Sequence, residues 1–141
     1  MSLLSPEQLI RAWYDEVWVA GRVDLVGRLM APDATLHGTG STGAEIARPA
    51  DFIAHFERMR GALSQLMVET VIVMASDTMA AARWRMRAFH DGDGLGVPPS
   101  RRPVEVSGLS ICRAEFGRIV EAWYEWDRLP FALRIGAVGP R

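Results

Sequence analysis

Residues 79–90 alternate between two kinds of side chain. Trp84, Met86 and Ala88 fall on one face of an extended chain, and the residues between and before them are arginines. Strict alternation of this kind predicts a β-strand with one face on a core. The arginine face is then either solvated or paired with a second subunit, so the chain must build a sheet that is covered on one side.

Further strands flank this run. Residues 67–76 precede it, with a tight turn at Asp77 and Thr78, and the runs 104–113 and 118–127 follow it. A turn at 115–117 joins the last two strands, and a short helix is predicted over 129–135. The carboxyl-terminal half is therefore predicted to be a meander of long antiparallel strands.

The amino-terminal part has helical signals. Ser5 is an expected N-cap, followed by Pro6 and by Gln8 three residues after the cap, and Gly21 is expected to end this helix. A shorter helix is predicted over 23–30. A strand over 33–38 carries His37, and a loop follows over 38–47.

A third helix is predicted to open at residues 48–51 and to present Phe52, Phe56 and Met59 on one face. Helices followed by a meander define an α+β fold, in one domain over residues 1–141. Because the helices cover only part of a strongly curved sheet, a conical cavity is expected between the two layers.

Composition removes several function classes. All sixteen basic residues are arginine, so Schiff-base and P-loop lysines are absent, and the net charge of −1 favours neither nucleic acid nor an anionic membrane. No apolar run could span a bilayer, and no signal peptide is expected. Three histidines and the single Cys112 lack metal-ligand spacing, so no metal or other cofactor is predicted. A lone cysteine favours the reducing cytoplasm.

The stretch 90–108 combines glycines, prolines and His90. We interpret it as a long hairpin connection, in which Gly92 and Gly94 supply positive φ angles and Pro98–Pro99 stiffens the return.

The last third of the chain resembles the SnoaL-like polyketide cyclases of the NTF2-like superfamily. The resemblance is carried by Phe89-His90, by residues 96–102, 108–113 and 117–123, and by Asp127, whereas Ser100-Arg101 and Arg118 depart from the family pattern. It implies an NTF2-like cone, a curved antiparallel sheet wrapped around N-terminal helices with an apolar cavity inside. It does not fix the activity, because the superfamily hosts several reactions and non-catalytic binders.

Asp127 is the first candidate for chemistry. In the cyclases that the chain resembles, the matching aspartate takes the proton α to a carbonyl and returns it to the product oxygen. Alternation places Glu121, Trp123, Glu125 and Asp127 on one face of the last strand, and a carboxyl beside tryptophans is partly desolvated. The alternative is that Asp127 caps the helix that follows.

Two histidines are candidate partners of Asp127. His90 shares the face of Trp84 and Met86 and is expected at the cavity mouth, or else exposed on the hairpin; His37 is expected to bond a substrate carbonyl, or else to be a satisfied structural residue. His55 is interpreted as a surface residue. Tyr124 has the opposite parity to Asp127 and is expected to face outward.

Large apolar residues are expected to form the core and to line the cavity: Trp13, Phe52, Phe56, Met59, Trp84 and Trp123. The hypothesis for function is a cofactor-independent cyclase or isomerase that acts on a hydrophobic, polyketide-like carbonyl compound. It removes a proton α to the carbonyl and stabilises the enolate, with Asp127 as acid/base. The competing hypothesis is a non-catalytic module that binds a hydrophobic small molecule. A homodimer through the outer sheet face is expected in either case.

Overall fold

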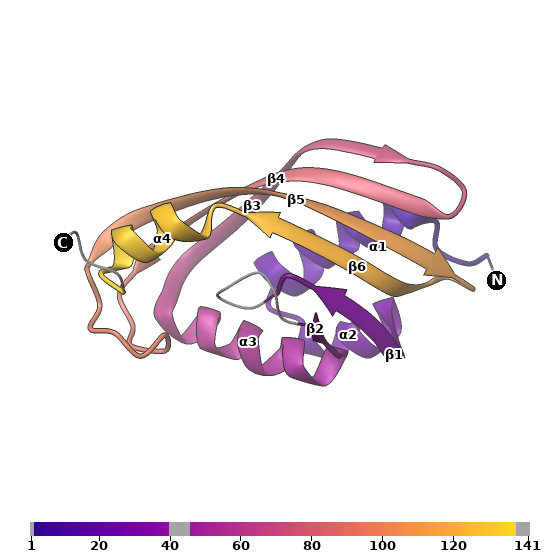
Figure 1. Ribbon diagram of the computed structural model, residues 1–141. Coiled ribbons are helices and arrows are strands. Elements are labelled where there is room, and N and C mark those ends of the chain that lie inside the picture. Colours follow the sequence, from indigo (N-terminus) through magenta and orange to yellow (C-terminus); the bar gives the residue numbers. More distant parts are fainter. Residues whose placement is uncertain (1, 40–45, 138–141) are drawn as a thin grey trace.

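The computed structural model describes residues 2–39 and 46–137. Within these residues, four α-helices, one π-helix, one 3₁₀-helix and six strands follow one another (Figure 1). The helical elements are α1 (Pro6–Ala12), η1 (Trp13–Val19), η2 (Val23–Leu25), α2 (Val26–Leu29), α3 (Pro49–Ala62) and α4 (Arg128–Ile135). The strands are β1 (Met30–His37), β2 (Ile46–Ala47), β3 (Leu63–Ala75), β4 (Met79–His90), β5 (Arg102–Glu115) and β6 (Arg118–Trp126).

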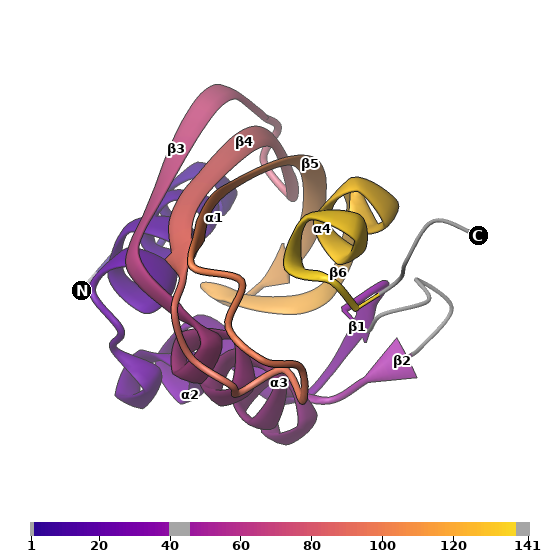
Figure 2. The ribbon, with the colours of Figure 1, turned by 90° about the vertical axis from the view of Figure 1, so that its left-hand side faces the viewer.

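The six strands form one curved, open sheet in the order β2-β1-β6-β5-β4-β3. All neighbours are antiparallel except β1 and β6, which run parallel. The pairing of β3 with β4 shifts register twice, and Gln65 within the first shift has a φ of 53°. Such bulges bend a strand, which lets β3, β4 and β5 arch over the N-terminal helices (Figure 2). The predicted α+β cone is confirmed.

The first helix begins as the sequence predicts. The Ser5 hydroxyl accepts the backbone N–H of Gln8, and the Gln8 side chain accepts the backbone N–H of Ser5. From Trp13 to Val19 the chain continues as a wider π-helix, a variant that is uncommon and is often found at functional sites. This turn buries Tyr14 against the sheet.

Two element boundaries differ from prediction. The expected helix over 23–30 is a 3₁₀ turn followed by one α-turn, and β1 starts at Met30 rather than at Asp33. Part of the expected loop over 38–47 is strand β2, and its residues 40–45 lie outside the described residues.

The interior face of the sheet is set by register. On β5 the buried residues include Val106, Ser110 and Cys112, and Ser110 pairs with Tyr124 while Cys112 pairs with Ala122. Tyr124 therefore faces inward. The expectation that it faces outward is wrong, because alternation tells which residues share a face but not which face is covered.

The loop from Asp91 to Arg101 is docked on the end of α3. The backbone N–H groups of Asp91 and Gly92 both donate to the carbonyl of Ala62, whose position at the helix end leaves it without a helical partner. A Cβ on Gly92 would lie 2.1 Å from the Gly61 oxygen. The positive φ angles expected at Gly92 and Gly94 are wrong: these glycines permit close backbone approach, and the positive φ of 78° belongs to Gly96.

Candidate functional site

A cavity of about 60 Å³ lies between the helices and the interior face of the sheet. Its wall is mostly apolar and aromatic, with a few polar groups among the aromatic rings. The lining residues are Tyr14, Trp18, Gly38, Thr39, Phe52, His55, Met59, Val68, Trp84, Met86, Val106, Tyr124 and Trp126. An apolar cavity with a few placed polar groups is the usual form of a small-molecule site.

Three residues form a hydrogen-bonded group at the inner wall: Tyr14 and Trp84 line the main cavity, and Ser110 lies behind them and lines a second, smaller cavity. The Trp84 indole N–H donates to Ser110 Oγ at 2.9 Å, and the Tyr14 hydroxyl is hydrogen-bonded to the same oxygen. Gly108 makes this arrangement possible, since a Cβ there would lie 2.3 Å from the Trp84 ring. The missing side chain thus lets the Trp84 indole lie over β5 at Gly108 and reach Ser110 two residues along the same strand.

Tyr124 stands beside this group. It is the cross-strand neighbour of Ser110, the residue is 9% exposed, and no hydrogen-bond partner of its hydroxyl is found among the described residues. Burial raises the pKa values of Tyr14 and Tyr124 well above that of a free phenol. Both hydroxyls therefore keep their protons at neutral pH.

A second, smaller cavity of about 10 Å³ lies behind the two tyrosines, between α1 and the sheet. Trp13 lines it, and the Trp13 indole N–H is sealed from solvent without a partner in the described part of the chain. Trp13 packs against Phe52 with ring centroids 4.6 Å apart. It is a core residue behind the main cavity rather than part of its lining.

The aromatic and apolar residues predicted to line a cavity divide into two groups. Phe52, Met59 and Trp84 are in the lining. Phe56 is buried next to them and packs edge-on against Trp18, with ring centroids 5.1 Å apart. Trp123 lies on the outer face of the sheet.

His55 belongs to the lining, although the sequence interpretation placed it on the surface. It is half-buried on α3, and its ring centroid lies 6.4 Å from that of Phe52. Its spacing could have revealed this position, because it lies three residues after Phe52 and four before Met59, on one helical face.

Asp127 lies where β6 passes into α4, directly after the lining residue Trp126. Its side chain is exposed and is not part of the described lining. It holds the N-cap position of α4 but makes no side-chain cap bond, and its backbone N–H donates to Ser107. The cap hydrogen bond that the alternative requires is thus missing from the structure, and Asp127 adjoins the cavity lining only as the residue that follows Trp126 in the chain.

His90 lies at the end of β4, on the interior face and fully buried. Its Nδ1 accepts the backbone N–H of Ser100 at 2.9 Å and is 2.8 Å from the Ser100 hydroxyl. Because Nδ1 accepts, the proton of the neutral ring is on Nε2, which is sealed without a described partner. His90 holds the return of the 91–101 loop and is absent from the described cavity lining.

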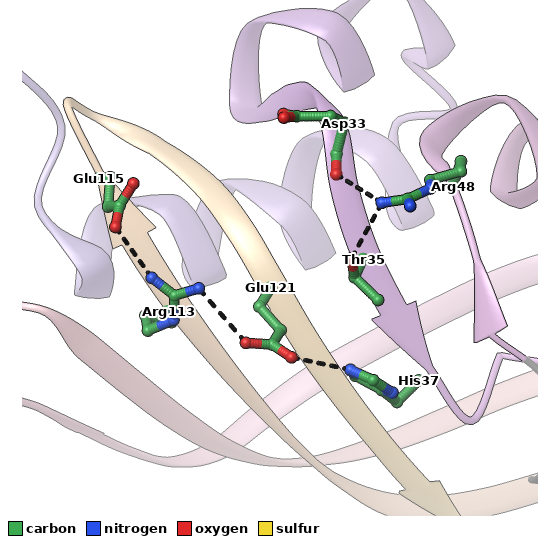
Figure 3. A network of polar contacts seen from close by, with 7 residues as sticks. All are labelled: Asp33, Thr35, His37, Arg48, Arg113, Glu115 and Glu121. Atoms are coloured by element: carbon green, nitrogen blue, oxygen red, sulfur yellow. Dashed lines mark hydrogen bonds and ion pairs between the residues drawn. The ribbon is translucent and has the colours of Figure 1, made fainter.

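His37 lies on the opposite face of the sheet from the cavity. Its Nε2 donates to Glu121 at 2.9 Å, and its ring stacks on Trp123 at 5.5 Å. Arg113 connects Glu121 to Glu115, which extends this outer-face network (Figure 3). The bond from His37, with help from Arg113, lowers the pKa of Glu121.

The described residues hold no group of three or more His, Cys, Asp or Glu side chains placed to bind a metal ion. None of the described helices combines the length and apolar character that a membrane span requires.

Comparison with known proteins assigns the family. The SnoaL-like polyketide cyclase family model matches residues 8–133, and the chain belongs to this family. Among curated proteins, none matches the chain.

Solved structures share the fold. IdmH from Streptomyces antibioticus, a candidate polyketide cyclase, is 25% identical with a TM-score of 0.79, and the match covers 93% of this chain and 98% of IdmH. A candidate SnoaL-like cyclase from Jannaschia sp. CCS1 is 23% identical with a TM-score of 0.80, and the match covers 99% of this chain and 98% of that protein. AclR from Streptomyces galilaeus, a candidate hydroxylase, is 22% identical with a TM-score of 0.80, and the match covers 94% of this chain and 85% of AclR. The same cone thus carries different assigned chemistries, so function must be argued from the site.

Proposed function

We propose that this protein is a cofactor-independent cyclase or isomerase that acts on a hydrophobic, polyketide-like carbonyl compound. The observation that carries the proposal is the aromatic cavity with hydroxyl groups on its inner wall, in a chain of the SnoaL-like cyclase family. Aromatic walls favour a flat ligand through apolar contact, while hydroxyl donors orient its oxygens.

The proposed reaction starts with proton transfer to Asp127. Its carboxylate removes the proton from the carbon α to a carbonyl, and the C–H electron pair moves into the enolate. In a cyclisation, that carbon bonds to a second carbonyl carbon of the same molecule, whose oxygen takes the proton from Asp127. In an isomerisation, the proton returns to a different carbon.

In this proposal the two histidines that were predicted as partners of Asp127 act indirectly. His90 fixes the loop that closes over the end of α3, through its bonds to Ser100. His37 fixes Glu121 and Trp123 on the outer face. Both are positioning residues, while His55 and the cavity hydroxyls are the polar groups beside the ligand.

The test uses exchange of α-protons for deuterium in 2-tetralone, followed by NMR in D₂O. Asp127→Asn is expected to slow protein-catalysed exchange by about 100-fold or more. Glu125→Gln is the matched control, because this exposed carboxylate lies two residues earlier on β6. Equal exchange rates for Asp127→Asn and the wild type would reject the mechanism.

One observation favours a second candidate, a non-catalytic binding module. The described lining contains no carboxylate, so the cavity itself offers no strong base. Under this alternative, 2-tetralone binds equally well to the wild type and to Asp127→Asn, and its α-protons exchange no faster than in buffer.

We further propose that two copies associate through the outer face of the sheet. Strand register places Met74, Ala81, Ile111 and Trp123 in one row across this face, and Met74 and Ile111 are 70% and 43% exposed. Exposed apolar rows of this kind mark association surfaces. Sedimentation velocity is expected to give a dimer, and Ile111→Glu a monomer with an unchanged circular-dichroism spectrum; a monomeric wild type would reject this proposal.

A further inference from the structure

The inner wall of the cavity has more hydroxyl protons than described protein acceptors. Ser110 Oγ accepts the Trp84 N–H and shares one hydrogen bond with the Tyr14 hydroxyl. Two hydroxyl protons meet in that bond and it uses only one, so either Tyr14 or Ser110 has a proton to donate elsewhere. Apart from these two hydrogen bonds, neither side chain has one in the described part of the chain.

Tyr124 supplies the second unused proton. Its hydroxyl has no described partner, yet it is not among the described polar atoms that are both sealed from solvent and without a hydrogen bond, which are Trp13 Nε1 and His90 Nε2. The hydroxyl therefore faces open space, and Tyr124 borders both cavities. Buried phenol groups normally have a hydrogen-bond partner, so this one is left available for a ligand.

We propose that Tyr124, together with the Tyr14–Ser110 pair, is an anchor for a carbonyl oxygen at the end of the ligand that enters the cavity first. A carbonyl oxygen has two lone pairs and no proton, which matches a wall that offers two donors. The anchor rests on the proposed function only for the ligand's class, because it concerns binding and orientation rather than proton transfer.

Spacing along β6 adds a condition on the ligand. Asp127 lies three residues beyond Tyr124, which is roughly 10 Å along an extended chain. The anchored oxygen and the carbon that Asp127 deprotonates therefore belong to different ends of the ligand. This describes an elongated fused-ring compound with a carbonyl at its leading end and the reacting carbonyl near the mouth.

Cavity size agrees with partial entry. The volume of about 60 Å³ is below that of the roughly 150 Å³ apolar cavity that encloses a benzene molecule. The leading edge of a ring fits inside, and we place the remainder beside Trp18, His55 and Trp126, the half-buried aromatic residues of the lining.

The experiment compares 1-tetralone with tetralin, which has the same rings without the oxygen. Binding is followed by intrinsic tryptophan fluorescence, and the wild type is expected to bind 1-tetralone roughly 3- to 10-fold more tightly. Tyr124→Phe is expected to remove most of this preference while tetralin affinity stays the same. The infrared carbonyl stretch of bound 1-tetralone should move to higher wavenumber in Tyr124→Phe, because a hydrogen bond is lost.

Met86→Leu is the matched control, since it alters the apolar lining at nearly constant volume and should leave the preference unchanged. If the wild type has no preference for 1-tetralone, or if Tyr124→Phe weakens both ligands equally, the anchor is overturned. Asp127→Asn separates the two proposals: it is expected to abolish deuterium exchange and to keep the carbonyl preference.

Discussion

On β6, Glu121 faces outward and Tyr124 faces inward, and the surroundings of their polar groups differ. The Glu121 carboxylate binds His37 and Arg113, so each of its oxygens has a cationic or N–H partner. The Tyr124 hydroxyl, three residues later, has no described partner. The outer network is satisfied by the protein alone, whereas the inner wall leaves hydrogen-bonding capacity for a ligand.

This difference changes which residues deserve functional attention. The sequence predicted His37 as a candidate catalytic partner of Asp127. Its ring instead bonds to Glu121 and stacks on Trp123, on the face of the sheet away from the cavity. Tyr124 was expected to face outward because its position on the strand has the opposite parity to that of Asp127, yet its hydroxyl is the hydrogen-bond donor without a described partner. A residue type suited to catalysis is therefore less informative than a polar group that faces a cavity without a partner.

Among the variants considered, Gly108→Ala is expected to destabilise the packing of the inner cavity wall most. The new Cβ would lie 2.3 Å from the Trp84 ring and 2.7 Å from the Glu125 carbonyl oxygen, so the ring and the strand must both shift. The free energy of unfolding is expected to fall by about 2–3 kcal/mol in urea titrations. Gly27→Ala is the control: beyond its chain neighbours and its own helix backbone, no atom lies within 4 Å of that Cβ, so a change within about 1 kcal/mol, stabilising in sign, is expected. Equal effects of the two changes would contradict the close packing of Trp84.

Ser110→Ala should have a smaller effect on the same wall. It leaves the Trp84 N–H and the Tyr14 hydroxyl without their common partner, and the free energy of unfolding is expected to fall by about 1–2 kcal/mol. The neighbouring Ser107→Ala, at a half-buried site without described side-chain bonds, should change it by less than about 0.5 kcal/mol. An effect of Ser110→Ala no larger than that of Ser107→Ala would show that the hydroxyl does not hold this group together.

The outer network should give the smallest effect, visible mainly in its pH dependence. Because the folded-state pKa of Glu121 is below its ordinary value of 4.5, the carboxylate stabilises the fold above that value. This contribution is lost as the pH falls through the lowered pKa. The stability difference between the wild type and Glu121→Gln, from urea titrations, should therefore shrink on going from about pH 6 to below about pH 4. His37→Phe keeps the stacking on Trp123 and should reduce the pH-dependent part of the difference; no change with pH would contradict the network.

The sequence predicted the local structure well where local chemistry decides it. The capping box at Ser5, the opening of α3 at Pro49 and the turns between the long strands are set by neighbouring residues. The loop after His90 shows where such signals stop. Its glycines were expected for their φ angles, but Gly92 is required because the backbone of α3, some thirty residues earlier, lies against it.

The sequence by itself determined the α+β class, the order of helices and strands, and which residues share a face. Only the tertiary structure decided which face of β6 meets the cavity, that His55 and Tyr124 border it, and that His37 does not. The physical reason is that alternation and helical spacing are properties of a segment, and they are unchanged when the segment is turned over. The pairing of Tyr124 with Ser110 across two strands is a long-range contact, and it fixes which side chains are buried.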